Sequence, residues 1–202
     1  MIQRTRLRLA ALSALIPIGA LAWYAAQKRT PEQLGGYFPN VILRDQDDRK
    51  HRFYDDLIKG KQVVIQFTYA SCSGICPLVT ANLVRVQQLL AERMGRDLFM
   101  YSISLRPELD QPKVLKQHMQ ALGIGPGWSF LTGEAADIDL IRRKLGMVDP
   151  DPAVDADVSQ HTGMIRIGNE PYQRWSACRG LARPEWIAKE IGWVNVASGP
   201  IA

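Results

Sequence analysis

The chain has 202 residues, of which 47% are hydrophobic and 22% charged, a composition typical of globular proteins and unlike that of disordered or fibrous chains. Its formal net charge of +5 is carried by five basic side chains that precede every acidic one: Arg4, Arg6, Arg8, Lys28 and Arg29. The other 20 of the 25 Lys and Arg residues equal the 20 Asp and Glu residues in number, so the body of the protein lacks the cationic excess that neutralises phosphates, and we expect no nucleic-acid partner.

The amino-terminal segment is predicted to be a membrane anchor. Residues 1–8 form a basic region that we expect to stay in the cytoplasm. Residues 9–26 carry no charge, and a helix of that length spans about 27 Å, close to the thickness of the bilayer hydrocarbon. A cleaved signal peptide is the alternative, because Ala20-Leu21-Ala22 is a small-x-small site. Both interpretations place the domain in the periplasm, outside the bacterial inner membrane, where thiols meet oxidants.

A single α/β domain is expected after the polar linker at 27–36, over residues 37–196. The β-branched and aromatic run QVVIQFTY at 62–69 predicts a buried strand. Further strands are expected at 37–43, 50–54, 98–105, 128–131, 161–167 and 172–176, with turns at 45–49 and at Gly168-Asn169, and helices are expected at 77–95, 112–122, 135–145 and 184–191. This alternation predicts a central mixed sheet flanked by helices.

Two of the three cysteines, Cys72 and Cys76, lie between the buried strand at 62–69 and the helix predicted to begin at Pro77. Ligands collect at the carboxyl ends of strands in such sheets, and a thiolate that caps a helix is stabilised by the helix dipole. Two soft thiolates suit Cu(I), zinc or a redox disulfide. The sequence has no second close cysteine pair for a four-cysteine zinc or iron–sulfur site. A structural disulfide or two buried thiols are the alternatives without a ligand.

The run VVIQFTYASCSGICPLVTANL resembles the SCO/SenC family, as do SISLRPELDQPKVLKQHMQALG, PGWSFLTG and HTGMIRIG. This family consists of membrane-anchored, thioredoxin-fold proteins that assist copper delivery to cytochrome oxidase. The resemblance covers most of residues 35–195 and implies a thioredoxin-like fold. It also implies that copper is bound by Cys72, Cys76 and His161. Two thiolates and one imidazole form a three-coordinate site suited to Cu(I).

Two positions depart from the family pattern. Gln160 precedes the implied ligand His161, where an acidic residue is common in the family. Arg106 stands where many members have Asp. Both departures bear on the partner and on the redox poise of the site, and both leave the three implied ligands intact.

The loop at 149–160 contains four aspartates and two prolines. It is interpreted either as a mobile arm that brings His161 to the cysteines or as a solvated loop built from Asp-Pro turns. Met147 and Met164 are interpreted as transient soft contacts for copper or as core residues, and strand alternation favours a core position for Met164.

Three other side chains with ligand chemistry have structural interpretations. His51 and His118 are expected to be surface residues. Cys178, between Arg174 and Arg179, is either a reactive thiol of low pKa or a buried cysteine, and the buried state is favoured.

Three functions are consistent with these residues. The first is a copper-binding assembly factor, a metallochaperone rather than an enzyme, that passes one ion to the copper-containing subunit of a terminal oxidase or to another copper protein. The second is a thiol-disulfide oxidoreductase in which Cys72 and Cys76 cycle and keep the target's cysteines reduced. The third is a redox sensor that uses the same pair. We expect the first.

Overall fold

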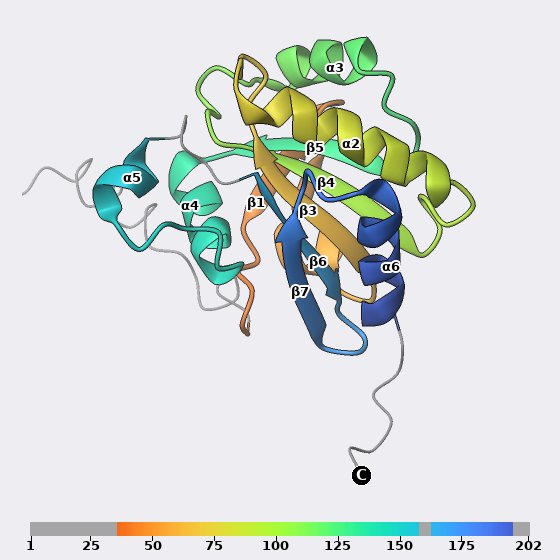
Figure 1. The fold of residues 1–202 in the computed structure, drawn as a ribbon. Helices are drawn as coiled ribbons and strands as arrows, with labels where there is room; N and C mark the ends of the chain where they lie inside the picture. The colour runs from red at the N-terminus through yellow and green to blue at the C-terminus, as the bar shows by residue number, and fades with distance from the viewer. Residues whose placement is uncertain (1–35, 158–162, 196–202) are drawn as a thin grey trace, which may run out of the picture.

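The computed structural model describes residues 36–157 and 163–195 (Figure 1). The predicted anchor at 9–26 and the implied ligand His161 lie outside these residues, so both stay predictions. Within the described ranges, no helix has the length and apolar character needed to cross a membrane.

Seven strands form one mixed sheet in the order β2-β1-β5-β4-β3-β6-β7. The bounds are Ile42–Asp45 for β1, Lys50–Arg52 for β2, Gln62–Thr68 for β3, Leu98–Ser104 for β4, Trp128–Gly133 for β5, Met164–Asn169 for β6 and Arg174–Arg179 for β7. The central strands β3, β4 and β5 are parallel, and the outer strands pair antiparallel to their neighbours. The sheet therefore has the mixed character that the sequence predicts, with its parallel part in the middle.

Helices cover both faces of the sheet (Figure 1). One face carries α2 (Ile75–Leu89), α3 (Pro112–Ala121) and α6 (Pro184–Val194), and α2 lies beside α6. The other carries the π-helical turn η1 (Phe53–Ile58) and α4 (Ala135–Lys144), with the short α5 (Pro152–Ala156) beyond α4. The core accordingly has two parts, one on each face.

Strand β3 shows why the sequence signal is so clear at this place. Val63 and Ile65 pack against the η1 and α4 side, whereas Val64 packs against the α2 and α6 side. Side chains alternate across a strand, so a strand covered on both faces needs an almost continuous apolar run. All seven residues of β3 are buried.

The first hairpin differs from its prediction. The strand expected at 37–43 is confined to β1, and the strand expected at 50–54 ends at Arg52. The chain then forms η1, which buries Phe53, Leu57 and Ile58. These three side chains lie at helical rather than strand spacing, so the apolar run covers the sheet instead of extending it.

The turn predicted at Gly168-Asn169 is also wrong, because both residues belong to β6 and pair with Trp175 and Arg174. The turn follows at 170–173, where Gln173 adopts a positive φ of 51°. Gly168 has a packing role instead: a Cβ atom there would lie 2.2 Å from the Trp175 ring. The glycine thus makes room for the indole of the neighbouring strand.

Candidate functional site

The carboxyl end of β3 leads directly into the two cysteines. Helix α2 begins at Ile75 with Gly74 as its N-cap, two residues earlier than predicted, so Cys76 is the second helical residue and not the cap. Pro77 occupies the third position. The N–H groups of the first helical turn have no intrahelical acceptor, so the missing N–H of proline costs no hydrogen bond there. All three cysteines are free thiols; Cys76 is buried, whereas Cys72 is half-buried. The dithiol therefore has one accessible and one protected sulfur.

A buried carboxylate fixes the loop that carries Cys72. Both oxygens of Asp110 accept hydrogen bonds from the backbone N–H of Ala70, at 3.3 and 3.1 Å, and Ser104 Oγ donates to Asp110 Oδ2 at 2.6 Å. The backbone N–H of Cys72 donates to the carbonyl of Tyr69 at 3.1 Å, which closes a tight turn. The loop after β3 is thus tied to the loop after β4.

Asp110 is a residue of the site that the sequence did not predict. The available signal was its place shortly after the second parallel strand, because the carboxyl ends of neighbouring parallel strands lie at one edge of the sheet.

Tyr69 and Arg106 form the wall of the site next to Cys72. The Tyr69 hydroxyl is hydrogen-bonded to the Cys72 sulfur, and this bond is the main reason why the pKa of Tyr69 is raised, with burial adding to it. The Arg106 guanidinium lies over the Tyr69 ring, 4.5 Å from the ring centroid. The phenol keeps its proton near neutral pH, so its O–H group donates a hydrogen bond to the sulfur.

The chain next to His161 lies against α2. Gly163 has a φ of +61°, and a Cβ atom there would lie 2.6 Å from Ile75 Cδ1 and 3.3 Å from Val79 Cγ2. Its carbonyl accepts a hydrogen bond from Gly180 N–H at 2.8 Å, which fixes it to the end of β7. Gly163 is therefore held against the first turn of α2, whereas His161, two residues earlier in the sequence, lies outside the described residues.

The described ranges 36–157 and 163–195 contain no group of three His, Cys, Asp or Glu side chains arranged to hold a metal ion. The structure brings Cys72 and Cys76 to the same loop and helix turn and does not test His161 as the third ligand.

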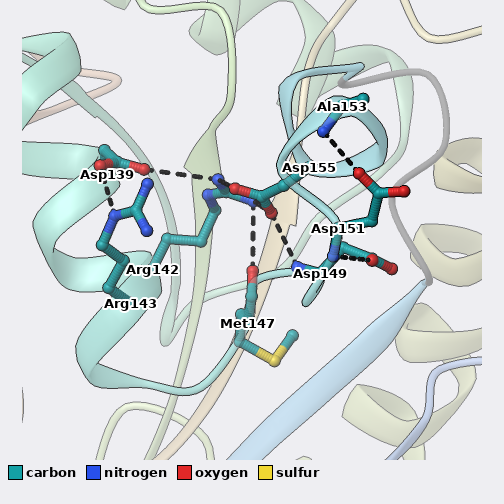
Figure 2. A network of polar contacts seen from close by, with 8 residues as sticks. All are labelled: Asp139, Arg142, Arg143, Met147, Asp149, Asp151, Ala153 and Asp155. Atoms are coloured by element: carbon teal, nitrogen blue, oxygen red, sulfur yellow. Dashed lines mark hydrogen bonds and ion pairs between the residues drawn. The ribbon is translucent and has the colours of Figure 1, made fainter.

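The described part of the aspartate-rich loop is attached to α4 (Figure 2). The guanidinium of Arg142 donates to both carboxylate oxygens of Asp155, at 2.7 and 2.5 Å, and this contact is the main reason why the pKa of Asp155 is lowered. Asp155 also accepts from the backbone N–H of Asp149 at 2.8 Å, and Asp151 caps α5 through Ala153 N–H at 2.9 Å. Asp149, Asp151 and Asp155 therefore have structural partners.

Met147 and Met164 line the same cavity, which has a volume of about 300 Å³. Phe67 and Leu105, near the carboxyl ends of β3 and β4, line it as well. Both methionines are half-buried. Met164 therefore faces this cavity, whereas strand alternation favoured a core position for it.

The remaining candidates have structural roles. His51 is hydrogen-bonded to Asp45 at 2.8 Å, and His118 packs edge-on against Phe130. Both side chains are half-buried, whereas the sequence predicts surface residues. Burial lowers the pKa of His118. Cys178 is half-buried and packs against the core on the α2 side, and burial raises its pKa to about 11, which favours a packed cysteine over a reactive thiol of low pKa.

Comparison with known proteins identifies the family. The sequence profile of the SCO1/SenC family matches residues 27–194. The SCO2-like protein of Rickettsia felis is 28% identical over 170 residues, which cover 76% of this chain and 81% of that protein. The crystal structure of yeast Sco1 with copper bound is similar at a TM-score of 0.62 and 19% identity, covering 80% of this chain and 96% of that one.

A further solved structure is BsSco, described as a member of the Sco family of cytochrome c oxidase assembly proteins with a disulfide switch. It is similar at a TM-score of 0.62 and 21% identity, covering 76% of this chain and 90% of that one. The fold and the cysteine pair define a thioredoxin-like domain with a dithiol at the carboxyl end of a central strand. The chain belongs to the SCO1/SenC family, as its resemblance implied.

Proposed function

We propose that this protein is a membrane-anchored copper chaperone that carries one copper ion on Cys72, Cys76 and His161, for maturation of the copper centre of cytochrome c oxidase. The supporting observation is that Cys72 and Cys76 lie on the loop and the first helical turn that follow the carboxyl end of β3. Gly163, two residues after His161 in the sequence, packs against Ile75 and Val79 of the same helix.

The donor set fits copper as cargo. Two thiolates and a neutral imidazole are soft to borderline ligands, and three of them satisfy Cu(I) without a fourth. Cys72 is the more accessible sulfur, so an incoming ligand from a partner protein can reach the ion on that side. The bound copper in yeast Sco1 and the oxidase-assembly role of the Sco family to which BsSco belongs support this assignment.

The location belongs to the same proposal. Residues 9–26 anchor the chain in the bacterial inner membrane and the domain lies in the periplasm, with release after signal cleavage as the alternative. A neutral domain behind a basic amino terminus fits that orientation. Protease accessibility in spheroplasts and whole cells tests the periplasmic location, and separation of membranes from the soluble periplasmic fraction distinguishes the anchored from the released form.

The test is copper stoichiometry in the reduced full-length chain in detergent. The wild type is expected to bind one Cu(I), and Cys72→Ala, Cys76→Ala and His161→Ala are expected to lose tight binding. Cys178→Ala is the matched control because it removes a thiol outside the site, and it should keep one equivalent. Full affinity and stoichiometry in His161→Ala would refute the assignment of that ligand.

One observation favours a second function, thiol-disulfide exchange. Accessible Cys72 and buried Cys76 resemble an attacking thiol and a protected resolving thiol. The disulfide switch reported for BsSco points the same way. His161→Ala separates the two functions, because an oxidoreductase keeps both dithiol exchange and oxidase assembly in that variant, whereas a copper carrier loses assembly.

A further inference from the structure

Tyr69 is hydrogen-bonded to Cys72, and Arg106 lies over the Tyr69 ring, but neither residue is one of the implied ligands. We propose that these two side chains bias the bound copper toward Cu(I) by stabilising negative charge on the Cys72 sulfur, an inference that rests on the proposed function.

The first step is the hydrogen bond from Tyr69. Its hydroxyl is bonded to the Cys72 sulfur, and the Tyr69 side chain is only 6% exposed, so water does not compete freely for the phenol. A hydrogen bond to an ionised acceptor is about twice as strong as one between neutral groups. The phenol therefore withdraws electron density from a sulfur that holds the ion.

The second step is the position of Arg106. Its backbone N–H donates to Ser104 Oγ at 3.0 Å, and Ser104 in turn donates to buried Asp110, so the start of this segment is fixed to the sheet. The guanidinium then stacks over the Tyr69 ring at 4.5 Å. Within the described residues Arg106 forms no ion pair. No described carboxylate therefore lies within ion-pairing distance of its guanidinium.

The third step is the charge of the loaded site. Cu(I) with two thiolates and a neutral imidazole has a net charge of −1, and Cu(II) with the same ligands has a net charge of zero. One electron converts Cu(II) to Cu(I), and no ligand or proton has to leave. A cation and a hydrogen-bond donor next to a thiolate stabilise the more negative Cu(I) form more strongly, because redox potentials of copper–thiolate sites follow the hydrogen bonding around sulfur.

The geometry also gives Arg106 an indirect effect. By stacking on the ring it fixes Tyr69 in the orientation that donates to Cys72, and the electrostatic attraction between a cation and an aromatic face holds this arrangement. Arg106 is thus a positioning residue as well as a charge. Arg106→Lys keeps the charge and the ring contact, whereas Arg106→Gln removes both.

The experiment measures Cu(I) and Cu(II) affinities of the full-length chain separately, with bicinchoninate competing for Cu(I) in the absence of oxygen and a Cu(II) chelator competing for Cu(II). Tyr69→Phe and Arg106→Gln are each expected to lower the ratio of Cu(I) to Cu(II) affinity about tenfold, which is about 59 mV for a one-electron couple. Arg106→Asp should lower it further, and Arg106→Lys should stay within about twofold of the wild type.

The control is Arg96→Gln. Arg96 lies just before β4, at the opposite end of that strand from Ser104, and its side chain is 74% exposed. Arg96→Gln removes one positive charge from the chain, as Arg106→Gln does, but at a position outside the site. The ratio of Cu(I) to Cu(II) affinity should therefore not change.

The outcomes separate the two proposals. A wild-type chain that binds no copper refutes the proposed function and this inference together. One bound copper with an unchanged affinity ratio in both Tyr69→Phe and Arg106→Gln refutes only the inference. An Arg106→Lys variant that behaves like Arg106→Gln would also overturn it, because the effect would then not come from the positive charge.

Discussion

Asp110 receives the backbone N–H of Ala70 on both of its carboxylate oxygens, at 3.3 and 3.1 Å. The two residues are 40 positions apart and follow neighbouring parallel strands, β3 and β4. Asp110 is only 2% exposed, and a buried charge is costly unless it is hydrogen-bonded. The Ala70 N–H and the Ser104 hydroxyl supply the hydrogen bonds that this carboxylate needs. The contact fixes the first residue of the cysteine loop to the sheet before the chain reaches Cys72.

Asp110→Asn is expected to destabilise the protein. The amide keeps the size of the side chain but offers one acceptor oxygen and turns a donor toward Ala70 N–H or Ser104 Oγ. Hydrogen bonds to a charged acceptor contribute about 1.5–3 kcal/mol, so we expect a loss of about 2 kcal/mol. Urea unfolding followed by circular dichroism measures it.

Asp47→Asn is the control for that substitution. Asp47 pairs with Lys116 at 2.9 Å, but both side chains are accessible, and exposed pairs contribute about 0–1 kcal/mol. Equal losses in the two variants would mean that Asp110 does not act as the anchor of the cysteine loop.

The contact between Arg142 and Asp155 predicts a pH dependence. The guanidinium lowers the pKa of Asp155 below its ordinary value of 3.8, so the unfolded chain holds the proton more tightly than the folded one. The contact's contribution to stability is therefore fully present above pH 3.8 and is lost as the pH falls below it.

Asp155→Asn measures this contribution. Both partners are mostly buried, with 16% and 10% of their side chains exposed, so we expect a loss of about 2 kcal/mol at pH 7. The difference from wild type in urea unfolding should shrink between pH 4 and pH 2.5. Asp139→Asn, on the more exposed partner of Arg142 and Arg143, should lose less than about 1 kcal/mol. A difference for Asp155→Asn that is constant with pH would contradict the ion pair.

Much of the fold was predictable because local patterns and burial agree. Strand β3 is covered on both faces, and its apolar residues Val63, Val64, Ile65 and Phe67 serve both parts of the core, which makes the run recognisable in the sequence. The turn predicted for the second hairpin was wrong because local pattern and packing disagree there. A Gly-Asn pair is a turn signal in isolation, but here the glycine is needed for the Trp175 ring of a paired strand, which only the tertiary structure reveals.

The candidate site was predictable in its ligand chemistry and not in its surroundings. Cys72 and Cys76 lie four residues apart, so their proximity is a local property. The contacts of Asp110 with Ala70 and of Arg106 with Tyr69 join segments nearly 40 residues apart through the parallel pairing of β3 and β4. No periodicity encodes such contacts, although the unusual arginine at 106 marked the right segment.

Cys178 provides a prediction on thiol reactivity. Burial raises its pKa to about 11, with Glu190 adding to the shift, so at pH 7 only about one molecule in 10⁴ carries the thiolate. Iodoacetamide should therefore modify Cys178 at least a hundredfold more slowly in the folded protein than in urea, as measured by mass spectrometry of the peptide. Modification at equal rates in both states would show that the thiol is not protected.

Gly163 provides the sharpest test of the packing beside the cysteines. A Cβ atom there meets Ile75 Cδ1 at 2.6 Å, and the φ of +61° is itself unfavourable for alanine by about 1 kcal/mol. Gly163→Ala should therefore lose more than that conformational cost, and should weaken Cu(I) binding by moving the chain next to His161 away from α2.

Gly123→Ala isolates the conformational part, because Gly123 has a φ of +64° and nothing within 4 Å of its virtual Cβ. We expect about 1 kcal/mol from Gly123→Ala and about 2–3 kcal/mol from Gly163→Ala, since overpacking adds about 1–3 kcal/mol. Ile75→Ala should recover part of the difference when combined with Gly163→Ala, because it removes the clashing Cδ1 atom. If both glycine variants lost the same stability and copper affinity, contact between this segment and α2 would have no part in holding the site together.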